Sequence, residues 1–304
     1  MRDTNVSPDN QNLPKGIHRI RLLPDPKLGA LWDSIILDKG LKDQLLSQAM
    51  LNFTLRSRVE RSVIPLHGVI LLVGPPGTGK TSLARGLAHR TAQSFNYGKF
   101  RLLEVEPHAL TSSAMGKTQR AVTDLFAQAI SEAALGAPTI VLLDEVETLA
   151  ADRSKMSLEA NPIDIHRATD AVLVQLDALA ETHPNLLFLA TSNFPEAVDS
   201  AFTSRCDLVA NIPLPDQEAC RQILSDCLLG LSRTFSDIAD LVSSPQFSKC
   251  AAECVGLDGR AIRKMVANAL ASSTAVAMNP GSLTMEQLLA AARAAKAGRG
   301  VKSK

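Results

Sequence analysis

The sequence lacks long apolar runs, an excess of charge of either sign, and a stretch that reads as a signal peptide. No apolar run approaches the ~20 residues that a membrane-spanning helix needs. The polar N-terminal region carries Pro8, Pro14, Pro24 and Pro26, which is unlike a secretory signal. With 32 basic and 31 acidic residues, the formal net charge is +1, so no global field attracts nucleic acid. We therefore expect a soluble, cytoplasmic protein.

Complete metal-binding motifs are also missing. The five cysteines are an odd number and all lie in the last third of the chain, at Cys206, Cys220, Cys227, Cys250 and Cys254. No histidine or second cysteine pair completes a zinc site around them, and no H-E-x-x-H motif appears. We interpret the cysteines as reduced thiols. The 45% hydrophobic content is enough for one or two buried cores.

The hydrophobic pattern divides the chain into a mixed region and a helical region. Residues 1–28 lack periodicity and are predicted to form a flexible N-terminal arm. From 29 to 213, apolar strands alternate with amphipathic helices, which predicts an α/β domain with a parallel sheet and crossover helices on both faces. Residues 214–296 are predicted to form a small helical lid domain, and 297–304 a basic, solvated tail.

One stretch, from Val69 to Ser82, carries the strongest chemical signal. Five apolar residues precede the sequence G-P-P-G-T-G-K-T, which fits the phosphate-binding pattern G-x-x-x-x-G-K-[ST]. Glycines let backbone N–H groups approach phosphate oxygens, Lys80 supplies a charge, and the Thr81 hydroxyl can bind Mg²⁺. The alternative, an ordinary turn between a strand and a helix, does not require the lysine and threonine. The predicted nucleotide-binding residues are Gly74, Pro75, Pro76, Gly77, Thr78, Gly79, Lys80, Thr81 and Ser82.

Two carboxylates directly follow the apolar strand T-I-V-L-L. Asp144 is predicted to hold Mg²⁺ together with Thr81, and Glu145 to accept a proton from the attacking water or to orient it. Two acidic residues in this place could instead cap the next helix, where negative charge is favourable. The phosphate-binding loop upstream favours the catalytic interpretation.

Three further polar residues are candidates for the same reaction. Asn193 follows another apolar strand and could position water, or could be a turn residue. Arg205 could reach the nucleotide of a neighbouring subunit, or could pair locally with Asp207. Arg260 opens a helix of the lid domain and could reach the γ-phosphate, or could be a surface arginine.

Together these motifs resemble those of AAA+ ATPases. The segments L-W-D-S-I-I, L-L-D-E-V-E-T-L-A, T-S-N-F-P-E-A-V-D-S-A-F-T-S-R-C-D and L-D-G-R-A-I-R-K resemble the pachytene checkpoint protein 2 group. That group consists of hexameric ATPases that remodel HORMA-domain proteins. The resemblance covers about residues 30–295.

The resemblance implies a role for each candidate residue. Lys80 belongs to the phosphate loop, Asp144 to the Mg²⁺ site and Glu145 to catalysis. Asn193, Arg205 and Arg260 take the sensor-1, arginine-finger and sensor-2 roles. Residues around Trp32 to Ile36, Ile36 among them, lie near the adenine of ATP. A central-pore loop that grips the partner corresponds to Ala114, Met115 and Gly116, with flanking residues on both sides.

Two departures from the group's pattern refine this expectation. In the group, the residue at the position of Ala114 is usually aromatic. Here Met115 is the only sizeable side chain that could grip the partner, so the force with which the partner is threaded is in question. Only about thirty residues precede Leu31, too few for the adaptor-binding domain of eukaryotic relatives. The chain is therefore expected to resemble the compact bacterial members, which are associated with HORMA proteins and antiphage cyclic-oligonucleotide synthesis.

Two functions of different classes follow from the sequence. The first is a homohexameric motor that hydrolyses ATP to unfold part of a HORMA partner, opening its closed complexes and switching off antiphage signalling. The second is an assembly factor or scaffold that responds to ATP binding without turnover. Glu145 and Arg205 favour the motor, because a binding switch needs neither. DNA processing is disfavoured by the near-neutral charge and by the absence of a basic stripe with interleaved aromatics.

Overall fold

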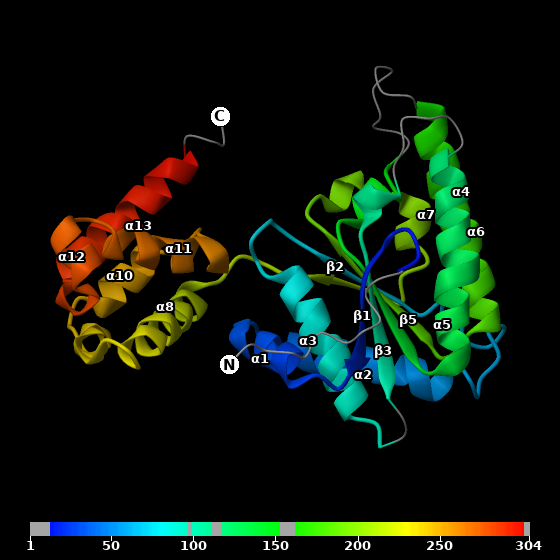
Figure 1. The fold of residues 1–304 in the computed structure, drawn as a ribbon, viewed down its shortest axis with the longest axis horizontal. Helices are drawn as coiled ribbons and strands as arrows, with labels where there is room; N and C mark the ends of the chain where they lie inside the picture. Colours follow the sequence, from blue (N-terminus) through cyan, green and yellow to red (C-terminus); the bar gives the residue numbers. More distant parts are fainter. Residues whose placement is uncertain (1–12, 97–98, 111–116, 153–161, 301–304) are drawn as a thin grey trace. The chain divides into compact units, whose positions relative to one another are not determined.

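The computed structural model describes residues 13–96, 99–110, 117–152 and 162–300. Its contacts divide the chain into two units. The first unit comprises Met1–Ser34, Lys39–Gly74 and Lys80–Asn211, and the second comprises Ile35–Asp38, Pro75–Gly79 and Ile212–Lys304. The division at Asn211 lies two residues before the boundary that the sequence predicts. Figure 1 shows the elements of each unit.

The first unit is a six-stranded sheet with helices on both faces, as the sequence predicts. Its strands are β1 (Ile17–Leu23), β2 (Val69–Val73), β3 (Phe100–Val105), β4 (Thr139–Leu143), β5 (Leu186–Ser192) and β6 (Leu208–Asn211). The sheet order is β1-β3-β4-β5-β2-β6. All neighbouring pairs are parallel except β1 with β3. The strands β2, β4 and β5 are buried along their whole length, which explains their continuous apolar sequences.

Helices cover the two faces of this sheet in two groups (Figure 1). One group contains α1 (Pro26–Ser34), α2 (Lys39–Leu55) and α3 (Lys80–Gln93). The other contains α4 (Lys117–Asp124), the π-helical turn η3 (Leu125–Ile130), α5 (Ser131–Gly136) and α6 (Pro162–Thr182). On this second face, the stacked rings of Phe126 and Phe188 lie 5.8 Å apart between centroids. Short helices complete the unit: η2 (Pro107–Ala109), η4 (Val146–Thr148), η5 (Pro195–Ala197) and α7 (Ser200–Thr203).

The predicted flexible arm over residues 1–28 is wrong for the part that the structure describes from Ile17 onward. Ile17–Leu23 forms the antiparallel edge strand β1, whose register with β3 runs from Ile17 opposite Val105 to Leu23 opposite Phe100. Only its first and last residues are buried, so the strand shows no strong apolar alternation. Backbone pairing and the bond from Arg21 Nε to Glu104 Oε1 (2.9 Å) hold it in place. Residues 1–12 lie outside the described part of the chain.

The second unit is helical around a separate apolar core, as predicted for the lid domain. It contains α8 (Gln217–Ser232), η6 (Ser236–Ile238), α9 (Ala239–Val242), α10 (Phe247–Glu253), α11 (Gly259–Leu270), α12 (Thr274–Met278), η7 (Pro280–Ser282) and α13 (Met285–Gly300). Cys220, Cys250 and Cys254 are fully buried in this core as free thiols. None of the helices that the structure describes is long and apolar enough to cross a membrane.

Two helical glycines allow a test of how tightly α1 packs on α3. A Cβ added at Gly86 in α3 would meet the Cβ, Cα and N atoms of Trp32 at 2.6–2.7 Å, so Gly86→Ala must displace α1. We expect it to lower the free energy of unfolding by about 1–3 kcal/mol. Gly230 in α8 has nothing within 4 Å of such a Cβ. Gly230→Ala should raise stability by about 0.5–1 kcal/mol, because glycine is a poor helix former. Urea denaturation of both variants checks this, and a stabilised Gly86→Ala protein would contradict the packing.

Candidate nucleotide site

The loop between β2 and α3 has the backbone geometry of a phosphate cradle. Gly74, Gly77 and Gly79 have φ values of 148°, 84° and 92°, a region that side-chain-bearing residues rarely adopt. Lys80 begins α3 and is only 5% exposed, and its Nζ donates to Gly74 O at 2.8 Å. The lysine ammonium and the N-terminus of α3 therefore meet at this loop, where an anionic phosphate would be stabilised.

Asp144, at the end of β4, binds two hydroxyl groups from different elements. Thr81 Oγ1 donates to Asp144 Oδ1 at 2.7 Å, and Thr191 Oγ1 donates to the same oxygen at 2.5 Å. Thr191 lies near the end of β5, so the ends of two parallel strands and the start of α3 converge here. Carboxylate and hydroxyl oxygens are ligands that suit Mg²⁺. The predicted pair Thr81 and Asp144 thus fits a magnesium ion, and Thr191 orients Asp144.

Glu145 has the only positive φ among the described non-glycine residues, with φ 54° and ψ 55°. Its carboxylate is bound from two sides: Asn193 Nδ2 donates to Oε1 at 3.2 Å, and His108 Nε2 lies 3.4 Å from Oε2. The backbone N–H of Glu145 donates to Thr191 Oγ1 at 3.1 Å. A left-handed backbone at such a residue is energetically costly and is typical of functional sites. Glu145 and Asn193 are therefore brought together as the sequence predicts.

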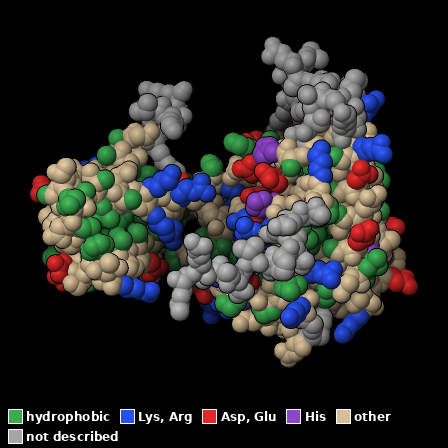
Figure 2. Space-filling view, viewed as in Figure 1, with side chains coloured by type: hydrophobic (Ala, Val, Ile, Leu, Met, Phe, Trp, Pro, Cys, Tyr) green, Lys and Arg blue, Asp and Glu red, His purple; other side chains and the backbone are tan. Residues whose placement is uncertain are grey.

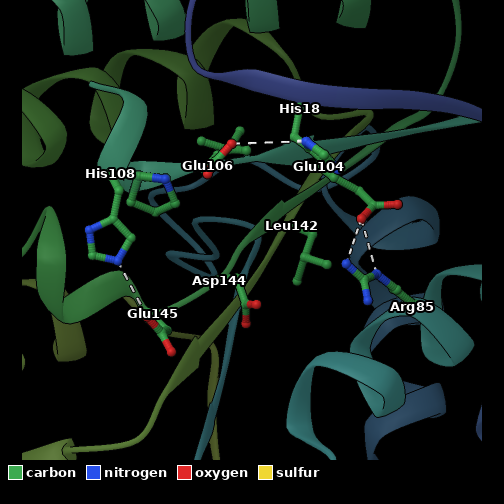
Figure 3. Close-up of a pocket in the computed structure, with 10 residues that line it drawn as sticks. His18, Arg85, Glu104, Glu106, His108, Leu142, Asp144 and Glu145 are labelled. Atoms are coloured by element: carbon green, nitrogen blue, oxygen red, sulfur yellow. Dashed lines mark hydrogen bonds and ion pairs between the residues drawn. The ribbon is translucent and has the colours of Figure 1, made fainter. Parts of the chain in front are cut away.

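A pocket of about 240 Å³ opens beside the carboxylates of Asp144 and Glu145. Figure 2 shows acidic and histidine side chains, in red and purple, gathered on one face of the first unit. Figure 3 shows Glu145 and His108 at one side of the pocket and the Arg85–Glu104 ion pair at the other. The pocket is lined by His18, Arg85, Glu104, Val105, Glu106, Pro107, His108, Leu142, Asp144 and Glu145.

The structure corrects the local pairing considered for Arg205. Its Nε and Nη2 atoms donate to the two carboxylate oxygens of Asp177 on α6, at 2.8 and 2.7 Å. Asp207 instead accepts hydrogen bonds from the backbone N–H groups of His67, Gly68 and Val69 at 2.7–3.2 Å. The alternative considered from the sequence, a local pair of Arg205 with Asp207, is therefore wrong.

The remaining candidate residues belong to other elements of the two units. Arg260 is exposed in the first turn of α11, and Ile36 packs against the apolar core of the second unit. Trp32 is buried against α3 in the first unit. Contacts of these residues with a nucleotide stay predictions. The pore-loop residues Ala114, Met115 and Gly116 lie outside the residues that the structure describes.

Sequence reasoning missed the residues that orient the predicted ones. Thr191 supports Asp144 and Glu145, and His108 contacts Glu145. Glu147 Oε1 accepts the backbone N–H of Asn193 at 3.1 Å. A hydroxyl at the end of the apolar sequence L-L-F-L-A-T was the available signal for Thr191. No local signal marked His108.

Comparison with known proteins places this geometry in a family. Residues 70–214 match the ATPase family associated with various cellular activities (AAA). The chain is 71% identical over 284 residues to CD-NTase-associated protein 6 of Pseudomonas aeruginosa, covering 93% of both chains. It is 34% identical to the pachytene checkpoint protein 2 homologue of Danio rerio, over 86% of this chain and 68% of that protein. The chain belongs to the AAA ATPase family.

Within the AAA ATPases, the resemblance to the pachytene checkpoint protein 2 group is confirmed. The match to this chain covers 52–68% of the length of the pachytene checkpoint protein 2 homologues that were compared. A solved structure, the E. coli MS115-1 HORMA:CdnC:Trip13 complex, shares the fold with a TM-score of 0.72 at 17% identity. This likeness covers 91% of this chain and 94% of that one. The predicted fold class, an AAA α/β domain followed by a helical domain, is also confirmed.

The bond from Thr191 to Asp144 can be tested without measuring turnover. Thr191→Val keeps the side-chain shape but removes the hydroxyl that orients Asp144. We expect the Mg²⁺ concentration needed for half-maximal binding of a fluorescent ATP analogue to rise by about ten-fold or more. Thr182→Val, at the exposed end of α6, is the matched control because its hydroxyl bonds only to Ala178 O in the described structure. An unchanged Mg²⁺ requirement in Thr191→Val would show that Asp144 needs no such support.

Proposed function

We propose that this AAA ATPase is a ring-forming motor that hydrolyses ATP to remodel a HORMA-domain protein. The observation that carries the proposal is the placement of Glu145, which follows Asp144, the partner of Thr81, and whose carboxylate is held by Asn193. This arrangement supports hydrolysis rather than binding alone. A carboxylate fixed beyond the phosphate loop can accept a proton from water, which binding of ATP does not require.

Each residue has a distinct role in the proposed reaction. The glycine loop and Lys80 bind the β- and γ-phosphates, and Glu145 and Asn193 orient the attacking water. Thr81 and Asp144 would hold Mg²⁺, which would neutralise part of the phosphate charge. Arg205 of a neighbouring subunit and Arg260 of the same subunit stabilise the charge that develops on the γ-phosphate.

The partner follows from the relatives rather than from the site. The Pseudomonas aeruginosa relative is named as associated with a CD-NTase, and the E. coli structure combines HORMA, CdnC and Trip13. By analogy, the substrate of this chain is a HORMA-domain protein, and remodelling it would switch off antiphage cyclic-oligonucleotide signalling in the cytoplasm. The pore loop at Ala114, Met115 and Gly116 would grip the partner within a homohexamer. An assembly factor that only binds ATP is the alternative.

Glu145→Gln separates the motor from the assembly factor. The amide cannot accept the proton of water, so we expect ATP hydrolysis to fall by about 10²–10⁴-fold while nucleotide affinity is retained. The HORMA partner should then stay bound in the presence of ATP, as seen by size-exclusion chromatography. Glu132→Gln, on the exposed surface of α5, is the matched control. If Glu145→Gln released its partner at the normal rate, the motor would be excluded and the assembly factor favoured.

Mixing two inactive variants tests whether the site is shared between subunits. Arg205→Ala keeps Glu145, and Glu145→Gln keeps Arg205. In a randomly mixed ring, about a quarter of the sites combine an intact Glu145 with an intact Arg205 from the neighbour. ATPase activity should therefore return on mixing. Absence of recovery, with mixed rings confirmed by mass spectrometry, would contradict an arginine acting between subunits.

A further inference from the structure

The guanidinium of Arg205 is held on two sides by the first unit. Asp177 accepts from Nε and Nη2 in a two-bond, side-on pair, and Ala201 O accepts from Nη1 at 2.8 Å. Three of the five N–H groups of the guanidinium are thereby engaged. The side chain is 24% exposed, so part of it remains accessible from solvent.

The two N–H groups that remain determine what Arg205 can still bind. One belongs to Nη1 and one to Nη2, since each of these nitrogens carries two hydrogens and uses one. No other hydrogen-bond partner of Arg205 occurs among the described residues. A planar guanidinium that is fixed along one edge keeps its other donors in a defined direction, which suits phosphate oxygens.

Asp177 also lies near the basic side chains of His67 and Arg61. His67 Nε2 lies 3.4 Å from Asp177 Oδ1, and Arg61 Nη2 lies 2.8 Å from the same histidine nitrogen. Arg61 Nη1 also lies 3.6 Å from Glu181 Oε1. The hydrogen bond from Arg205 lowers the pKa of Asp177, so this carboxylate stays ionised and keeps its hold on the arginine.

We propose that Asp177 is the positioning residue of Arg205, fixing its guanidinium side-on so that the two free donors face a neighbouring subunit's phosphate. The inference rests on the proposed function, in which Arg205 acts on the nucleotide of the next subunit. Asp177 touches neither nucleotide nor water in this scheme; it acts only through Arg205. A flexible arginine would have to be ordered at each turnover, whereas Asp177 orders it in advance.

An ordinary stabilising ion pair is the alternative. The side chains of Asp177 and Arg205 are 39% and 24% exposed, and a two-bond pair of this geometry can stabilise the fold even at such exposure. The two roles therefore predict different results. Loss of a purely structural pair lowers the melting temperature. Loss of a positioning residue lowers kcat while the protein stays folded.

The experiment is a double-mutant cycle on steady-state ATP hydrolysis by the full chain. Asp177→Asn removes the charge and one acceptor but keeps the shape. We expect its kcat to fall about ten-fold with KM within about two-fold, because the arginine is misplaced while the phosphate loop is untouched. Arg205→Ala should lose more activity. The double variant should be no slower than Arg205→Ala alone, since Asp177 then has nothing to position.

Glu218→Gln is the matched control because it breaks a pair of the same geometry elsewhere. Arg221 donates to both carboxylate oxygens of Glu218, at 2.8 and 2.7 Å, on the exposed surface of α8. This variant should keep normal kcat. Melting temperatures and oligomer size of all variants are measured in parallel, so that a folding defect is recognised.

The outcomes separate the inference from the function on which it rests. Normal kcat in Asp177→Asn together with an inactive Arg205→Ala overturns the positioning role but leaves the shared site intact. Additive losses in the double variant also overturn it, because Asp177 would then act independently of Arg205. Normal kcat in Arg205→Ala overturns the role of the arginine itself, and the positioning role falls with it.

Discussion

The carboxylate of Asp144 is the point on which the nucleotide site depends. One of its oxygens accepts hydroxyl groups from Thr81 and Thr191, so the start of α3 and the end of β5 are both tied to the end of β4. Thr191 also accepts the backbone N–H of Glu145 and thereby helps to hold that residue in its left-handed conformation. The carboxylate that would bind the metal and the carboxylate that would act on water thus both depend on the hydroxyl group of Thr191.

Much of the fold could be predicted from local sequence because the parallel strands are buried on both faces. Their continuous apolar runs identify strands without knowledge of their neighbours, and the polar residue after each run marks the edge where a site forms. The phosphate loop, Asp144, Glu145 and Asn193 all follow from this rule. The edge strand Ile17–Leu23 could not be found in this way, because only its two end residues are buried.

The orienting contacts could not be predicted because they depend on the order of strands and on the path of distant helices. His108 approaches Glu145 only because β3 lies beside β4 in the sheet. Asp177 meets Arg205 across 28 residues, while Asp207, two residues away in sequence, binds backbone N–H groups instead. Sequence proximity therefore favoured the wrong partner for Arg205, because the carboxylate of the nearby Asp207 accepts hydrogen bonds from backbone N–H groups instead.

The hydrogen bonds of Asp207 connect the segment that carries Arg205 to the start of β2, two parts of the molecule with separate roles in the proposed reaction. Its carboxylate and its own N–H bind the backbone from His67 to Val69, where β2 begins. The far end of β2 leads into the glycine loop. These hydrogen bonds attach the segment of Arg205 to one end of the fully buried strand β2, whose other end leads into the phosphate loop of the same subunit. Strand β2 is therefore the direct backbone connection between the segment of Arg205 and that loop.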